Sequence, residues 1–387
     1  MDEQAARDIL SGERRGICAA ILRAGLAVGS VPYSVAVRLR RWGYRKGILA
    51  SRSAGEAHGA QAVGLRAVPV ISVGNITTGG TGKTPMVAWV VQHLREGGRR
   101  PAILMRGYKA TGGKSDEAEM LRRICADSVP APSESPTPEP ARPEDRPSAR
   151  SWSVPVIVNP DRVAGARQAV EQGADVLVMD DGFQHRRLRR DLDIVLIDAT
   201  NPFGYGWCLP RGLLREPVSS LRDAGAIVIT RSDAISTDSL QALKDRLACF
   251  ARGASVHTAI HRPNRIIHED GAQSPAETME KRRSLAFCGI GNPRSFFDTL
   301  KRLGADLVAC RALEDHVEYT KEVVESLRQE AIRCGAEAFV TTQKDAVKLA
   351  GVRLPLPLWL LEVRMEVVTG RDDLLERIRQ ACGRKDN

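Results

Sequence analysis

The residues with the clearest capacity for chemistry form one glycine- and threonine-rich run: Thr77, Thr78, Gly79, Gly80, Thr81, Gly82, Lys83 and Thr84. Glycines let successive backbone N–H groups approach an anion closely. A lysine then reaches phosphate oxygens, and a threonine hydroxyl ligates Mg²⁺. We therefore expect Lys83 to contact the β- and γ-phosphates of a nucleoside triphosphate and Thr84 to bind the metal ion.

The segments on either side of this loop must place it correctly. An apolar run, VPVISV, precedes the loop and predicts a short buried strand, and MVAWVVQHL follows it with helical periodicity. Strand, glycine loop, Gly-Lys-Thr and helix are the order of a phosphate-binding P-loop. Thr77 stands where the usual first glycine would be. The alternative is a glycine-rich turn with an accidental Lys-Thr, but the flanking elements favour the P-loop.

Two acidic pairs follow further predicted elements. The apolar strand in ADVLVMDDGFQH ends on Asp180 and Asp181, and such a position downstream of a P-loop is typical of a magnesium site. We favour the metal site over a simple turn there. Asp116 and Glu117 follow a shorter strand and a loop, which places them at the ligand-binding edge of a parallel sheet. Asp116 could equally be the N-cap of a helix.

Four arginines lie within five residues in His185-Arg186-Arg187-Leu188-Arg189-Arg190. One interpretation is an anion-binding edge beside the nucleotide, and the other is a solvated loop. The residues alone leave both interpretations open. His316, beside Asp315, is a titratable group that suits catalysis, but a lone histidine is more often structural.

Repeated alternation of strand and helix predicts the fold class. We expect an α/β, P-loop NTPase-like, doubly wound and mostly parallel sheet, with a second, smaller α/β domain and an N-terminal amphipathic helix. The expected domains are a basic membrane-surface segment at 1–60, a kinase-type core at 61–240, a linker at 241–283 and a C-terminal α/β domain with its closing helix at 284–387. A Pro/Ser-rich disordered insertion is expected at about 128–151.

The N-terminal segment is basic and apolar. No acidic residue occurs between Glu13 and Glu56, whereas that interval holds Arg14, Arg15, Arg23, Arg38, Arg40, Arg41, Arg45, Lys46 and Arg52. Its longest uncharged run, Ala24–Val37, is too short to span a bilayer. An apolar helix with a basic flank and Trp42 near the junction suits an anionic membrane surface. The alternative is a core helix with a solvated basic end.

The composition of the 387 residues restricts the function classes. The formal net charge of +10 calls for an anionic partner, but the aromatic content is only 4% and no basic-aromatic interleaving occurs, so we expect no nucleic-acid partner. The eight cysteines are scattered without a C-x-x-C pair. This pattern predicts reduced thiols and neither a disulfide framework nor a zinc site.

Several segments together resemble the tetraacyldisaccharide 4'-kinases, the lipid A 4'-kinases of Gram-negative bacteria. They occur in the family's order between about Val70 and Leu349: VISVGNITTGGTGKTP, ILMRGY, SDEAEML, VIVNPDRVAGARQAV, VLVMDDGFQHRRLRRDLDIVLIDAT, GLLREP, IVITRSD, AFCGIGNPRSFFDTL, EDHVEYT and TTQKDAVKL. The P-loop and DDGFQHRRLRRD are highly specific as a pair. The Thr in place of the first glycine also occurs in the family.

The resemblance implies a membrane-associated kinase with ATP and Mg²⁺ as cofactors. It would transfer the γ-phosphoryl group to the 4'-hydroxyl of a tetraacylated glucosamine disaccharide 1-phosphate, giving lipid IVA, at the cytoplasmic face of the bacterial inner membrane as a peripheral protein. Its partners would be this glycolipid and an anionic membrane surface, and no protein partner is indicated.

The resemblance also assigns roles to residues. Residues 77–84 would bind the nucleotide, Asp116 would be the catalytic base paired with His316, and Lys83 would act on the phosphates. Thr84, Glu117, Asp180 and Asp181 would lie around the metal. Ser115 and Ala118 replace the family's Gly and Pro around the acid, which affects the expected loop geometry only.

Two rival classes remain open from the residues alone. A P-loop GTPase or metal-chaperone ATPase would also carry the loop, but Arg231-Ser232-Asp233 is a poor guanine-reading motif and paired metal ligands are missing from the sequence. A non-catalytic, membrane-bound nucleotide-binding module would bind the nucleotide without forming a product.

Overall fold

The structure is a computed structural model that describes residues 8–54, 68–107, 116–126, 152–279, 282–315 and 317–383. The expected insertion at 128–151, Ser115 and His316 lie outside the described residues. The chain divides into two compact units. Unit 1 comprises residues 1–260 and 367–387, and unit 2 comprises residues 261–366.

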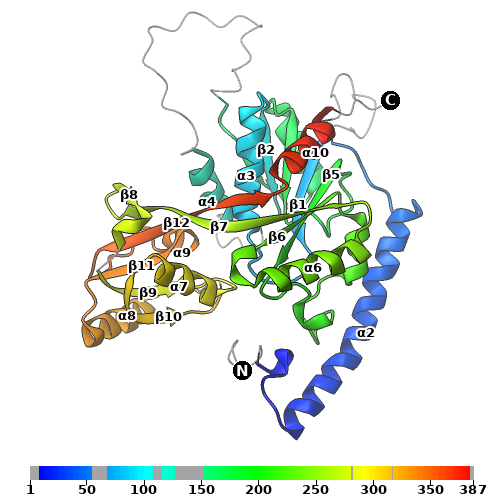
Figure 1. The fold of residues 1–387 in the computed structure, drawn as a ribbon. Coiled ribbons are helices and arrows are strands. Elements are labelled where there is room, and N and C mark those ends of the chain that lie inside the picture. The colour runs from blue at the N-terminus through cyan, green and yellow to red at the C-terminus, as the bar shows by residue number, and fades with distance from the viewer. Residues whose placement is uncertain are drawn as a thin grey trace, which may run out of the picture. The chain divides into compact units, whose positions relative to one another are not determined.

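Unit 1 contains a parallel sheet with the strand order β7-β6-β5-β1-β4-β2-β3 (Figure 1). The strands are β1 (Val70–Asn75), β2 (Pro101–Met105), β3 (Val156–Val158), β4 (Val176–Asp180), β5 (Leu192–Asp198), β6 (Ala226–Thr230) and the first part of β7 (Ser255–His268). The central strands are buried on both faces, which explains their continuous apolar runs. The chain order reverses beside β1, so the loop after β1 lies where ligands bind in such sheets.

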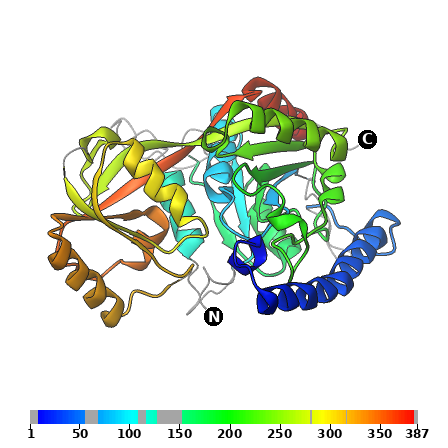
Figure 2. The same cartoon turned by 60° about the horizontal axis from the view of Figure 1, so that its bottom comes forward.

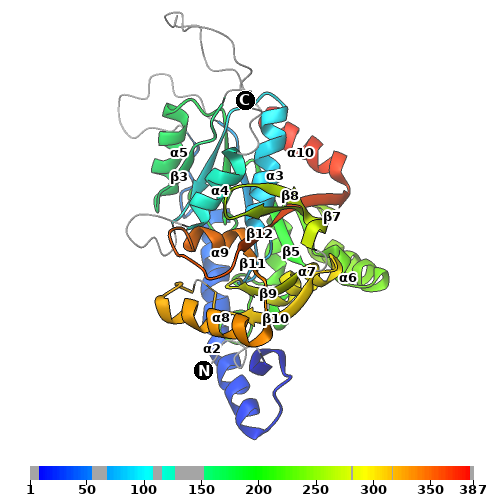
Figure 3. The ribbon, with the colours of Figure 1, turned by 90° about the vertical axis from the view of Figure 1, so that its left-hand side faces the viewer.

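Helices cover this sheet, and Figure 3 shows α5 and α10 on opposite sides of it. The unit's helices are α2 (Ile17–Arg45), α3 (Lys83–Glu96), α4 (Asp116–Ala126), α5 (Arg162–Glu171), α6 (Thr237–Phe250) and α10 (Arg371–Gly383), with short 3₁₀ turns at η1 (Gly204–Gly206), η2 (Val218–Asp223) and η3 (Ser232–Ala234). α3 packs on β1, β2 and β4, whereas α10 packs on β1 and β5. Asp161 caps α5 by accepting from the N–H groups of Val163 and Ala164.

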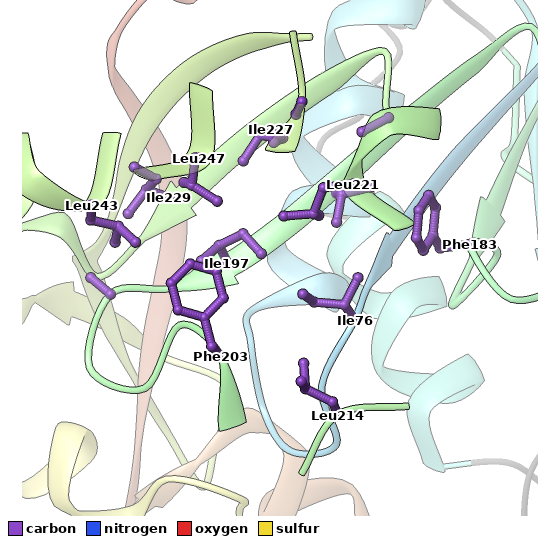
Figure 4. Packing of buried hydrophobic residues seen from close by; sticks show 14 of the residues in the cluster. Ile76, Phe183, Ile197, Phe203, Leu214, Leu221, Ile227, Ile229, Leu243 and Leu247 are labelled. Atoms are coloured by element: carbon purple, nitrogen blue, oxygen red, sulfur yellow. The ribbon is translucent and has the colours of Figure 1, made fainter. Parts of the chain in front are cut away.

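One hydrophobic core of unit 1 joins the phosphate-loop strand to α6 and η2. Figure 4 shows Ile76, Phe183 and Leu214 beside Leu221, with Ile197, Ile227, Ile229, Leu243 and Leu247 continuing the cluster. Gly74 permits a close approach here, because a Cβ on it would lie 2.7 Å from the Cβ of Phe183. The segment after β4 is therefore pressed directly against β1.

The long helix α2 lies along the outside of unit 1 (Figure 2). It continues through Pro32 over 29 residues, and by length and composition it could cross a membrane. This differs from the expectation based on the uncharged run Ala24–Val37, because the helix extends beyond that run at both ends. Length and composition do not by themselves distinguish a spanning helix from one that lies on a membrane surface.

Unit 2 is a smaller α/β unit with the parallel strand order β10-β9-β11-β12. Its elements are the second part of β7, β8 (Gln273–Pro275), η4 (Ala276–Met279), β9 (Arg283–Cys288), α7 (Pro293–Arg302), β10 (Asp306–Ala312), α8 (Lys321–Cys334), β11 (Ala338–Thr342), α9 (Gln343–Lys348) and most of β12 (Leu358–Thr369). β8 pairs antiparallel with β7. The core is built around Phe287 and Phe339, whose rings meet edge to face.

The predicted fold class is confirmed: a mostly parallel α/β sheet with an N-terminal apolar helix. The unit boundaries differ from the sequence-based domains at several points, and residues 1–60 and 241–260 belong to unit 1. Unit 2 begins within β7 and not at 284, because β7 and β12 are long strands that each begin in one unit and end in the other. The closing helix α10 belongs to unit 1, since it packs on β1 and β5.

Candidate active site

The loop between β1 and α3 has the backbone that the glycine pattern predicts. Gly79 and Gly82 adopt positive φ angles of 106° and 87°, which a side chain would strain. α3 begins at Lys83 directly after Gly82, with no side-chain cap on its first N–H groups. Inside the loop, the side-chain amide of Asn75 donates to Thr81 Oγ1 at 2.9 Å. The result is a rigid turn that leads into a helix N-terminus, which is the geometry that binds phosphate.

Two other segments hold this loop in place. Thr78 N–H donates to the carbonyl of Leu213 at 2.7 Å, and Arg215 N–H donates to the carbonyl of Ile76 at 2.7 Å. On the other side, Thr230 Oγ1 donates to the carbonyl of Thr81 at 3.0 Å. These hydrogen bonds support the loop from both sides.

Arg231 fixes the glycine part of the loop. Its Nη2 donates to the carbonyl of Gly80 at 2.8 Å, while its Nη1 forms an ion pair with buried Asp198. Asp198 also accepts from Thr200 Oγ1 at 2.7 Å. The Arg231-Ser232-Asp233 segment after β6 therefore helps to position the phosphate loop through Arg231.

Asp181 lies beside the loop lysine. Its carboxylate is 3.7 Å from Lys83 Nζ, and Arg215 Nη1 lies 2.8 Å from both of its oxygens. Burial alone would raise the pKa of Asp181, but Lys83 and Arg215 outweigh burial and lower it below its ordinary value. Asp181 is therefore a carboxylate at neutral pH.

The pKa of the neighbouring acid, Asp180, is shifted in the opposite direction, upward. Burial, and then the negative charge of Glu117, raise its pKa to about 7, although Lys83 acts to lower it. Its Oδ1 is buried and has no hydrogen-bond partner among the described residues. A buried, unsatisfied carboxylate oxygen is costly unless a cation or proton binds it.

These acids fit a Mg²⁺ ion. Within the described ranges, no three His, Cys, Asp or Glu side chains converge as a complete metal cage. Mg²⁺ does not require one, because it binds through one or two carboxylates together with phosphate oxygens and water. Asp180 supplies an oxygen in need of a cation, and Asp181 supplies a stable negative charge.

Arg162 lies beneath the end of β4, where its guanidinium contacts the backbone next to the two aspartates. It is buried, and its Nη1 and Nη2 donate to the carbonyls of Leu104 at 2.6 Å and Asp180 at 2.9 Å. Burial lowers the pKa of Arg162 to about 10, so it remains charged at neutral pH. Arg162 joins the carboxyl ends of β2 and β4, and its charge partly offsets that of the two aspartates.

Asp116 is the first residue of α4, and its side chain is exposed. Glu117, the next residue, is near enough to Asp180 to raise the pKa of that carboxyl. The start of α4 therefore belongs to the same acidic edge as the end of β4. His316, the expected partner of Asp116, lies outside the described residues.

The arginine-rich segment after Asp181 has mixed environments. Arg186 pairs with Asp223 at 3.0 Å and Arg190 pairs with Asp193 at 2.9 Å, so both guanidinium groups are engaged within the protein. Arg187 and Arg189 are exposed. The structure thus favours neither of the two simple interpretations for the whole segment, because its arginines divide between internal ion pairs and solvent.

Sequence reasoning assigned no role to Arg162, Arg215 or Arg231, although each contacts the site. Arg215 lies in GLLREP and Arg231 in IVITRSD, two of the segments that carried the family resemblance. Their position in these family segments was the one feature of the sequence that indicated a role for them. Their roles depend on contacts across many residues of chain, which a linear pattern does not reveal.

The chain is similar to known proteins over most of its length. A family model described as tetraacyldisaccharide-1-P 4'-kinase matches residues 22–383. The tetraacyldisaccharide 4'-kinase of Anaeromyxobacter dehalogenans (strain 2CP-C) is 38% identical over 375 residues, covering 94% of this chain and 91% of that protein. The tetraacyldisaccharide 4'-kinase of Geobacter sulfurreducens is 37% identical over 365 residues, covering 92% and 94%.

A solved structure is similar over a comparable length. It is described as the "apo" form of LpxK from Aquifex aeolicus in complex with ATP. The similarity has a TM-score of 0.66 at 25% sequence identity and covers 93% of this chain and 99% of that one.

Proposed function

We propose that this chain, which belongs to the tetraacyldisaccharide-1-phosphate 4'-kinase family, transfers the γ-phosphate of ATP to the 4'-hydroxyl of tetraacyldisaccharide 1-phosphate. The reaction yields ADP and a lipid IVA-type product in lipid A biosynthesis. The observation that carries the proposal is the Lys83–Asp181–Arg215 cluster at a P-loop, within a chain that matches the family over residues 22–383.

The nucleotide would bind to residues 77–84. Backbone N–H groups of this loop and the N-terminus of α3 would contact the phosphates, and Lys83 would neutralise charge on the β- and γ-oxygens. Thr84, Asp180, Asp181 and Glu117 would surround Mg²⁺. When bound, Mg²⁺ neutralises the negative charge that develops on the phosphate oxygens during transfer.

Asp116 would act as the general base. A sugar hydroxyl is a poor nucleophile, so a carboxylate within hydrogen-bond reach assists by accepting its proton as the new O–P bond forms. The bond between the γ-phosphorus and the bridging oxygen breaks, and ADP leaves with that oxygen. His316 would orient Asp116 or accept its proton. The exposure of Asp116 at the start of α4 is consistent with direct access to a substrate.

The glycolipid substrate suggests that the enzyme works at a membrane, and α2 supports a peripheral position at the cytoplasmic face of the inner membrane. One side of α2 carries a row of exposed apolar residues: Ile17, Ile21, Val28, Val31, Val35, Leu39 and Trp42. At about 100° per residue these positions fall within an arc of about 80°. Such a stripe suits insertion among lipid acyl chains beside an anionic headgroup layer.

Family membership favours the kinase over the two rival classes. In addition, Arg231 is committed to Asp198 and Gly80, which leaves this segment poorly suited to reading a guanine base.

The decisive test is transfer of labelled γ-phosphate from ATP to tetraacyldisaccharide 1-phosphate in detergent micelles. We expect wild type to form labelled lipid. Lys83→Ala removes a charge that neutralises the phosphates, and Asp116→Asn removes the base. Each variant should reduce turnover by at least 100-fold, since a positioned base alone contributes about 10²–10⁴-fold. Arg294→Ala is the control, because its side chain is 93% exposed.

Each outcome decides a different part of the proposal. ATP hydrolysis without labelled lipid would contradict the kinase and point to a switch ATPase. Labelled lipid formed at the wild-type rate by Asp116→Asn would uphold the kinase and remove Asp116 as its base.

A further inference from the structure

One side of α2 contacts the rest of unit 1 through hydrogen bonds and ion pairs from neighbouring turns of the helix. The Tyr33 hydroxyl donates to the carbonyl of Arg215 at 3.0 Å. Arg41 Nη1 donates to Glu216 Oε2 at 2.5 Å, and Arg40 Nη2 donates to the carbonyl of Gln184 at 2.9 Å. These contacts do not require α2 to be near a lipid. They join the helix to the segment around Arg215 and to the segment after β4.

Both of these segments also touch the phosphate loop. Arg215 N–H donates to the carbonyl of Ile76, and Gln184 Nε2 donates to the carbonyl of Asn75 at 2.7 Å. The Arg215 side chain reaches onward and holds both oxygens of Asp181. A continuous set of direct contacts therefore runs from Tyr33 through Arg215 to the acid that lies beside Lys83.

The Arg41 end of this attachment is a buried charge cluster. Arg41 and Glu216 are both almost fully buried, and Arg41 also pairs with Asp223 at 2.6 Å. Arg186 pairs with Asp223 from the other side. Burial lowers the pKa of Arg41, with Glu216 acting to raise it, and the guanidinium stays charged at neutral pH.

Buried ion pairs add little to stability compared with apolar packing, but they fix one geometry, because any displacement leaves a charge uncompensated. A helix that only had to cover the core could use apolar residues here. The sequence instead places Arg41 where it determines the position of Glu216, the residue directly after Arg215. Arg41 therefore pairs inside the protein and does not face a membrane or solvent.

We propose that Tyr33 and Arg41 of α2 are positioning residues of the phosphoryl-transfer site: Tyr33 holds the backbone carbonyl of Arg215 and Arg41 holds the side chain of Glu216, so that the Arg215 guanidinium keeps Asp181 oriented for its metal ion. This inference rests on the proposed role of Asp181 as a metal ligand. It adds a second function to the apolar helix, because the same element that presents the exposed stripe also sets the geometry of an acid at the active site.

The inference can be tested by metal binding to the full chain without lipid. Mn²⁺ would replace Mg²⁺, and its binding in the presence of a non-hydrolysable ATP analogue would be followed by electron paramagnetic resonance. The variants are Tyr33→Phe, which removes one hydroxyl, and Arg41→Met, which removes one charge. Arg222→Met is the matched control, because Arg222 lies on the same η2 segment as Asp223 but is exposed.

We expect Arg41→Met to weaken Mn²⁺ binding about tenfold and Tyr33→Phe about threefold, since loss of groups that orient a metal ligand costs about 10–100-fold in affinity. Arg222→Met should match wild type. In EDTA, all variants should bind the analogue within about twofold of wild type, because the loop itself is intact. In the micelle assay, the KM for the lipid should remain unchanged while the metal requirement rises.

Arg41→Met leaves buried Glu216 with only Arg186, at 4.0 Å, as a cationic neighbour among the described residues, so the fold of this variant must be checked by circular dichroism. Tyr33→Phe keeps the inference falsifiable if Arg41→Met does not fold. Wild-type Mn²⁺ affinity in folded Tyr33→Phe would overturn the inference and leave the proposed function intact. A rise in lipid KM with unchanged metal affinity would also overturn it, because α2 would then serve lipid capture alone. Wild type that binds the analogue equally with and without metal would overturn the metal assignment itself.

Discussion

Adjacent aspartates at the end of β4 acquire different charge states from their surroundings. Asp181 has two cationic neighbours, which keep it ionised, whereas burial and Glu117 raise the pKa of Asp180 to about 7. The two side chains are therefore not interchangeable. Asp181 supplies permanent charge, and Asp180 supplies a site that a proton or a metal ion must fill.

His185 provides a pH prediction at the same scale. Burial, and then the nearby Arg162, lower its pKa to about 4, so it is neutral in the folded state at neutral pH. The unfolded chain binds a proton at about pH 6.5, so unfolding takes up a proton below that pH. Stability is therefore complete above about pH 6.5 and is lost as the pH falls toward 4.

We expect His185→Gln to reduce this acid sensitivity. Between pH 7.5 and pH 5, wild type should lose about 1–2 kcal/mol more free energy of unfolding than the variant, given about 1.4 kcal/mol per pH unit for one proton. Urea unfolding at the two pH values measures the difference. An equal loss in both proteins would show that His185 is not the group responsible.

At the scale of elements, the sequence predicted the strands and the loop because their information is local. The apolar run of β1, the glycines Gly79 and Gly82, the Lys83-Thr84 pair and the helical pattern after them together predict a phosphate loop. The resemblance to the kinase family, which rested on such local segments, is confirmed by the family match. The loop's supports were not predictable, because Arg231 and Arg215 reach it from distant parts of the chain.

The same limitation explains why the internal ion pairs of Arg41 were not predicted. A run of basic residues on an apolar helix has the same appearance whether its members face lipid or pair inside the protein. Only the positions of Glu216 and Asp223 decide between these cases, and both lie far along the chain. The roles expected for Asp116 and His316 stay predictions.

The approach of β1 to the segment after β4 provides a prediction about elements. Gly74→Ala would place a Cβ 2.7 Å from the Cβ of Phe183 and 2.8 Å from its backbone nitrogen. We expect a loss of about 1–3 kcal/mol in the free energy of unfolding, the usual cost of overpacking a core. Gly253→Ala is the control, because an added Cβ there meets no atom within 4 Å. Equal thermal midpoints for the two variants would contradict the close packing.

At the scale of the whole molecule, the net charge of +10 and the stripe on α2 point toward an anionic membrane. Each basic residue near such a surface contributes about 1 kcal/mol at low salt, and screening removes much of this as salt rises. The apolar contribution does not depend on salt in this way. The two contributions can therefore be measured separately.

We expect the full chain to bind vesicles that contain about a third phosphatidylglycerol and to be partly released by 0.5 M salt, because salt screens only the charge term. Val28→Glu combined with Val35→Glu should reduce binding at least tenfold at every salt concentration, since both residues lie on the exposed stripe. Flotation of vesicles measures both effects. Wild-type flotation of the double variant would remove the stripe from the membrane contact.

The position of α10 has a consequence for synthesis. Unit 1 is interrupted by residues 261–366 and resumes at Val367, and α10 then packs on β1 and β5. Arg377 of this helix donates to the carbonyl of Gly225, and Arg99 donates to the carbonyl of Cys382. A ribosome makes the phosphate loop well before α10, because residues 261–366 come between them. The nascent chain therefore carries an uncovered strip of its central sheet until residues 371–383 have been made, and that is the interval in which a chaperone would have most to protect.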